Sequence, residues 1–167
     1  MCRMNRSDLT IPRTRLEMMS NAICYSIFLA VIAFLLLKWG ELPDAVPFHF
    51  GLSGEADQYG SPARLLILPA VAVVVTILME VLERHPQVHN YPSRLNEDNR
   101  EAFYLNSRRM LNMTKNMTLI IFSIVILEIL SVALEGSSLF GVAMLPLIFM
   151  LIGIPIIYGL IRRRQIK

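Results

Sequence analysis

The chain has 167 residues, of which 54% are hydrophobic and only 17% are charged, and its formal net charge is +3. A soluble domain has about 45–50% apolar and about 25% charged residues, so the composition excludes an ordinary soluble domain. The apolar residues form four long blocks, which a core of this size cannot hide and which therefore require lipid. The basic residues cluster at the ends of these blocks, so we expect no nucleic-acid partner.

The four blocks predict an all-α integral membrane protein, a bundle of four transmembrane helices. A hydrocarbon core of about 30 Å needs about 20 apolar residues in a helix, and each block is long enough. The predicted spans cover about residues 18–38, 62–82, 115–134 and 139–161, with an outer loop 39–61, a cytoplasmic loop 83–114 and basic tails 1–17 and 162–167. We interpret the first block as a retained anchor, because it is longer than a signal-peptide core and no small-residue cleavage site follows it.

The distribution of lysine and arginine predicts the orientation in the cell membrane. Both tails and the loop between the second and third spans, counted with Lys115 at the start of the third span, carry fourteen of the sixteen basic residues, and the remaining segments carry only Lys38 and Arg64. Basic residues remain on the cytoplasmic side. We therefore expect both termini in the cytoplasm and the loop 39–61 outside.

The third span is predicted to continue a helix that begins in the cytoplasm near Ser93 or Asn96. No proline or glycine interrupts the chain from Ser93 to Glu135, and Gly136 follows where a helix end needs a left-handed residue. The basic residues on the cytoplasmic part of this helix are expected to face water or lipid phosphate: Arg100, Arg108 and Arg109.

The loop 39–61 is predicted to be an ordered extracytoplasmic structure. Pro43 and Pro47 favour extended segments, and Gly54 favours a turn. Ser61 is expected to cap the second helix, with Pro62 at its first position. The loop should therefore present its side chains in a defined arrangement.

Residues in and around this loop resemble a bacterial membrane domain by their identities and spacing: Leu42-Pro43-Asp44, Val46-Pro47, His49-Phe50, Ser53-Gly54-Glu55, Asp57 and Tyr59-Gly60-Ser61. The resemblance is to domain-of-unknown-function family 1648, which forms the N-terminal part of SdpI-type immunity proteins, and it covers about residues 30–75. It implies a bacterial or archaeal envelope protein without an established catalytic activity.

Five residues of the loop are candidate ligand-binding residues: Asp44, His49, Phe50, Glu55 and Asp57. One histidine with carboxylates could hold zinc, but no second histidine or cysteine is predicted outside. The favoured interpretation is that the aspartates cap turns and the histidine bonds backbone carbonyls. We expect no metal site and no cofactor.

Glu128 is the sixth candidate, because it lies inside the third span. An ionisable group there is costly and indicates a functional site by default, although a structural hydrogen bond between helices is an equal alternative. Glu80, near the inner end of the second span, is interpreted as a structural partner of Arg84. The partners expected for the membrane glutamate lie near the outer face: Lys38, Arg64 and His49.

The leading functional hypothesis is recognition of an extracytoplasmic peptide, lipid or toxin by the outer loop. The third helix would then act on a cytoplasmic regulator, in an immunity- or signalling-like role. The alternative is a proton-coupled transporter subunit that uses Glu128; four helices would need to form a homo-oligomer to enclose a pathway. We do not expect an enzyme, since the sequence has no Gly-x-Ser-x-Gly or His-Glu-x-x-His motif and only one outer histidine.

Overall fold

The computed structural model describes residues 11–167. Four of its helices are long and apolar enough to cross a membrane, so the chain is a multi-pass membrane protein and the predicted class is confirmed. The longer elements are α1 (Arg15–Leu37), β1 (Val46–Phe50), β2 (Ala56–Gly60), α2 (Ile67–Arg84), α3 (Arg100–Glu135) and α4 (Met144–Gln165). Short 3-10 turns lie between them: η1 (Trp39–Glu41), η2 (Pro62–Leu66), η3 (Pro86–Val88) and η4 (Gly141–Ala143).

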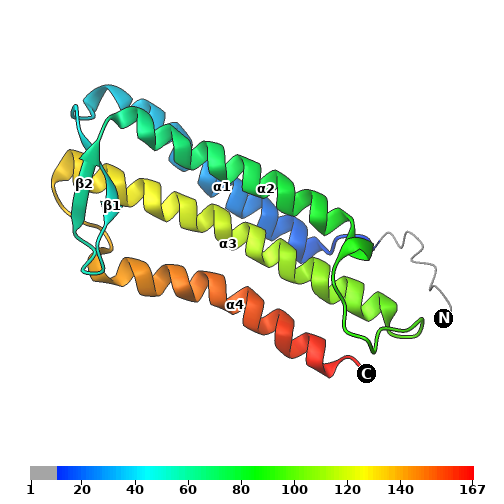
Figure 1. Ribbon diagram of the computed structural model, residues 1–167. Coiled ribbons are helices and arrows are strands. Elements are labelled where there is room, and N and C mark those ends of the chain that lie inside the picture. Colours follow the sequence, from blue (N-terminus) through cyan, green and yellow to red (C-terminus); the bar gives the residue numbers. More distant parts are fainter. Residues whose placement is uncertain (1–10) are drawn as a thin grey trace.

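α3 is the central helix of the bundle. It packs along α1, α2 and α4, and within the described part of the chain no other pair of these helices packs extensively. α1 and α2 lie on one side of α3 and α4 lies on the other (Figure 1). α1 begins and α4 ends at the same end of the bundle, opposite to the β-hairpin, so we call the two ends the hairpin end and the terminal end.

α3 has 36 residues and is therefore about 54 Å long. It begins at Arg100, so the predicted start near Ser93 or Asn96 was wrong. Asn96 and Asn99 each accept a hydrogen bond from the other's backbone N–H, at 3.0 and 2.9 Å, which favours a local turn over a helix. At its other end, Gly136 adopts φ 66° and confirms the predicted left-handed cap.

β1 and β2 form an antiparallel hairpin that the sequence did not predict as strands. Its register is irregular around His49. Gly54 at the tip has φ 78°, and a Cβ atom there would overlap the backbone of Gly141, between α3 and α4. The hairpin tip therefore rests directly on the turn that joins α3 to α4.

The interior differs between the two ends of the bundle. Towards the hairpin end, apolar side chains of α1, α2 and α3 form the core together with Val46 of β1. Large apolar side chains on the outer faces of α1, α2 and α4 are exposed, as expected for helices that face lipid. Towards the terminal end, the interior contains the aromatic side chains of Phe103 and Tyr104 together with many polar and charged side chains.

Candidate functional site

The hairpin carries four of the five predicted loop residues, and Asp44 lies just before it; the five are not gathered at one point. His49 Nδ1 lies 2.6 Å from Asp57 Oδ1 on the facing strand, and both side chains are half exposed. The predicted bond from His49 to backbone carbonyls was therefore wrong. Asp44 and Glu55 lie exposed on the surface. The described residues contain no group of three metal-ligating side chains.

Phe50 is the predicted residue that lines a pocket. This hairpin pocket has a volume of about 340 Å³ and is walled by β1, by η2 with the start of α2, and by α3. Its lining is apolar apart from Arg64, whose guanidinium carbon lies 4.4 Å from the centroid of the Phe48 ring. Within residues 11–167, no carboxylate lies within ion-pair distance of Arg64. The pocket thus combines an apolar wall with one cation that no acid neutralises.

Glu128 is fully buried and binds the turn after α3. It accepts a hydrogen bond from Ser138 Oγ and, at 3.0 Å each, from the backbone N–H groups of Leu139 and Phe140. The chain reverses direction after Gly136, and this reversal brings the donors of residues 138–140 back to the Glu128 carboxylate. Glu128 therefore holds the turn on which the hairpin tip rests.

The partners predicted for Glu128 were wrong, because each of the three has another partner. Lys38 donates to Glu41 at 2.8 Å. Arg64 stacks on Phe48, and His49 pairs with Asp57 as described above.

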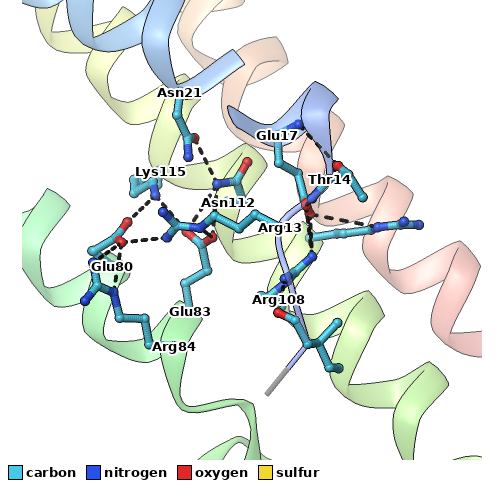
Figure 2. Close-up of polar contacts among 12 residues, drawn as sticks. Arg13, Thr14, Glu17, Asn21, Glu80, Glu83, Arg84, Arg108, Asn112 and Lys115 are labelled. Atoms are coloured by element: carbon cyan, nitrogen blue, oxygen red, sulfur yellow. Dashed lines mark hydrogen bonds and ion pairs between the residues drawn. The ribbon is translucent and has the colours of Figure 1, made fainter. Parts of the chain in front are cut away.

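A second polar cluster, which we call the terminal network, joins α2 to α3 (Figure 2). Lys115 is 0% exposed, and its Nζ donates to Glu80 at 2.5 Å and to Glu83 at 2.7 Å. Glu83 is 1% exposed and also accepts from Asn112 at 3.2 Å. Arg13, just before α1, bridges Glu80 and Glu83 at 2.5 and 3.0 Å. Two carboxylates of α2 thus bind cations from two other parts of the chain.

The same network joins α1 to α3. Glu17 closes the capping box at the start of α1, accepting from the backbone N–H of Thr14 at 2.7 Å. It also accepts from Arg108 at 3.0 and 2.9 Å. One turn along α1, Asn21 accepts from Asn112 at 2.9 Å. The expectation that Arg108 faces water or lipid was wrong, because Glu17 draws it into the bundle, where it is 4% exposed.

The network carries an excess of positive charge. Five basic side chains, Arg13, Arg84, Arg108, Arg109 and Lys115, face three carboxylates, Glu17, Glu80 and Glu83. Burial opposes the charge on Arg13, but its hydrogen bonds and the charges of Glu80 and Glu83 outweigh burial and raise its pKa. The predicted pair of Glu80 with Arg84 is confirmed, at 3.0 Å. Glu80 also forms ion pairs with Arg13 and Lys115.

Helical spacing could have revealed the terminal network in the sequence. Arg108, Asn112 and Lys115 recur at intervals of four and three residues, which places them on one face of a helix. Glu80 and Glu83 are three residues apart on α2, and α1 carries a similar polar pair one turn apart. Arg108 and Lys115 were interpreted as markers of topology and Glu80 only as a partner of Arg84, so the shared faces were overlooked.

Comparison with known proteins places the hairpin in a recognised domain. Residues 26–73, from α1 through the hairpin into α2, match the family described as Domain of unknown function (DUF1648). A segment of 79 residues is 38% identical to an uncharacterized protein of Archaeoglobus fulgidus. That match covers 42% of this chain and 38% of the archaeal protein, so the chain spans well under half of that relative. No solved structure matches the chain. The predicted resemblance is confirmed to this extent: residues 26–73 carry the DUF1648 segment, which includes the whole hairpin.

Proposed function

We propose that the protein is a receptor of the cell membrane whose hairpin pocket binds an apolar, extracytoplasmic peptide that carries an acidic group. Both termini lie in the cytoplasm in this proposal, as the fourteen basic residues of the tails and inner loop favour. The observation that carries the proposal is Arg64, the one basic side chain in an otherwise apolar pocket, which has no carboxylate partner in the described structure. A peptide carboxylate would supply that partner.

The pocket chemistry supports this ligand class. A guanidinium forms two parallel hydrogen bonds with a carboxylate, and stacking on Phe48 fixes one face of Arg64 while its edge remains available. The apolar wall, which includes Phe50, suits the side chains next to the acidic group. The hairpin has only two strands, so each strand keeps one unpaired edge. An extended peptide can hydrogen-bond to such an edge, and a lipid chain cannot.

The hairpin is connected to the rest of the molecule in a way that supports signalling. Its tip rests on Gly141, and Glu128 of α3 holds the same turn. α3 then continues without interruption to the terminal network. A peptide that shifts the hairpin would therefore act on the helix that reaches the proposed cytoplasmic regulator. The resemblance to SdpI-type proteins supports an immunity-like role for this response.

Proton-coupled transport through Glu128 is the alternative proposal. Its three hydrogen bonds to the following turn support a structural role for this carboxylate. No contact in the described structure specifically favours transport.

The test is survival of bacteria that express the protein and are challenged with secreted killing peptides of related bacteria. The wild type should protect against at least one peptide, and Arg64→Gln and Phe50→Ala should each remove the protection at equal protein levels. Lys38→Gln is the matched control, because Lys38 is the other basic residue of the predicted outer face and is already paired with Glu41. Two results would contradict the proposal: protection that persists in Arg64→Gln, or a wild type that protects against none of the peptides.

A further inference from the structure

A second cavity lies between α1 and α2, where these two helices do not pack extensively against each other. This groove has a volume of about 500 Å³. Its walls are mostly apolar and include Phe28 and Leu29 of α1 and Val73 and Ile77 of α2. Glu80 and Arg84 line it towards the terminal end. The groove therefore has an apolar body and a charged mouth.

One buried hydroxyl in the groove has no partner. Thr76 is 7% exposed and lines the groove, and its Oγ1 makes no hydrogen bond. Hydroxyls of α3 show the alternative that a helix offers, a hydrogen bond to the preceding turn: Thr118 donates to the carbonyl of Thr114 at 2.9 Å, and Ser123 donates to that of Leu119 at 2.8 Å. A buried polar group without a partner is costly, so Thr76 indicates a ligand with an acceptor at this depth.

We propose that this groove binds an anionic phospholipid from the leaflet at the terminal end. An acyl chain occupies the apolar body, an ester carbonyl accepts the hydrogen bond of Thr76, and the phosphate binds Arg84. Arg84 lies two helical turns nearer the terminal end than Thr76, and its guanidinium folds back onto Glu80, which lies only four residues beyond Thr76 and therefore about 6 Å along the helix axis. This order matches that of ester and phosphate in a lipid whose head group faces the terminal end.

Charge selects an anionic head group. The mouth of the groove adjoins the terminal network, in which five basic side chains face three carboxylates. The side chain of Arg84 is 67% exposed and bonds Glu80 through Nε and one terminal nitrogen, so its other terminal nitrogen remains available to a phosphate. Basic residues near a membrane surface attract anionic lipids.

The experiment is native mass spectrometry of the full chain, released from bilayers that contain equal amounts of dioleoyl phosphatidylglycerol and dioleoyl phosphatidylcholine. The wild type should retain one phosphatidylglycerol in preference to phosphatidylcholine. Thr76→Val, which keeps the shape and removes the hydroxyl, should lower retention about fivefold. Arg84→Gln should remove the preference for the anionic lipid. Thr118→Val is the matched control and should retain lipid as the wild type does.

A variant that fills the groove separates loss of lipid binding from loss of folding stability. Val73 is 48% exposed, so Val73→Trp enlarges a side chain that faces the groove without disturbing the core. It should abolish retention while the melting temperature stays within a few degrees of the wild type. Equal retention of both lipids by the wild type, equal behaviour of Thr76→Val and Thr118→Val, or full retention by Val73→Trp would overturn the proposal.

Discussion

Removal of Lys115 should destabilise the protein more than removal of any exposed lysine. Lys115 is fully buried and donates to Glu80 and Glu83. Lys115→Met would leave Glu83, 1% exposed, with one cation fewer, although Arg13 and Asn112 still reach it. Breaking a buried ion pair costs about 3–5 kcal/mol. Because these two partners remain, we expect about 3 kcal/mol, the lower end of that range.

A double-mutant cycle in mixed micelles measures this interaction. Lys115→Met and Glu83→Gln should each lower the free energy of unfolding, and the double variant should lose about 2 kcal/mol less than the sum of the two. Lys38→Met is the control, since Lys38 forms a partly exposed pair with Glu41 and should cost below about 1 kcal/mol. Additive losses, or a loss for Lys115→Met no larger than that for Lys38→Met, would refute the reasoning.

Three further predictions concern the hairpin end and the loop before α3. Gly54→Ala should loosen the hairpin by more than about 2 kcal/mol, because its positive φ alone costs about 1–2 kcal/mol and the added Cβ also overlaps the backbone of the α3–α4 turn. Hydrogen exchange of the hairpin amides should rise, whereas Gly40→Ala, with open space around it, should leave exchange unchanged. Glu128→Gln should cost about 1–3 kcal/mol in thermal unfolding, because an amide cannot accept all three hydrogen bonds; Ser138→Ala should lower stability in the same direction, and a neutral result for both would contradict the structural role. Burial lowers the pKa of His89 below its ordinary value of 6.5, although its hydrogen bond to a backbone carbonyl opposes this. The stability from neutral His89 should therefore be complete above pH 6.5 and lost as the pH falls below it. Unfolding measured from pH 7.5 to pH 5 should show this loss in the wild type and a flatter profile in His89→Asn, and identical profiles would contradict it.

Local signals in the sequence were sufficient to predict those helix ends whose backbone geometry strongly favours one residue type. Gly136 ends α3 in the left-handed region, and Ser61 accepts from the N–H of Ala63 just before the helical turn that starts at Pro62. Both depend only on neighbouring residues. The four spans follow from composition in the same way, because a long apolar block has few alternatives to a membrane helix.

Tertiary contacts account for what the sequence did not predict. β1 contains Pro47 and no clean alternation, and it is stabilised by Val46, which packs into the core. The partners of Glu128 come from a turn whose path is visible only in the folded chain. Arg108 was expected to face cytoplasmic water or lipid phosphate, because basic residues at span ends usually mark topology. Its burial depends instead on Glu17 of another helix.

The most direct test of the account is peptide binding to the protein in nanodiscs, followed by the fluorescence of Trp39, the chain's one tryptophan. Trp39 packs against the core at the hairpin end. The probe is an apolar, tryptophan-free peptide, compared with the same peptide amidated at its C-terminus. We predict that the free carboxylate binds about fivefold more tightly to the wild type and to Lys38→Gln, and that Arg64→Gln removes this difference. Equal binding of both peptides to the wild type, or a difference that persists in Arg64→Gln, would contradict the proposal that Arg64 in the hairpin pocket recognises the ligand.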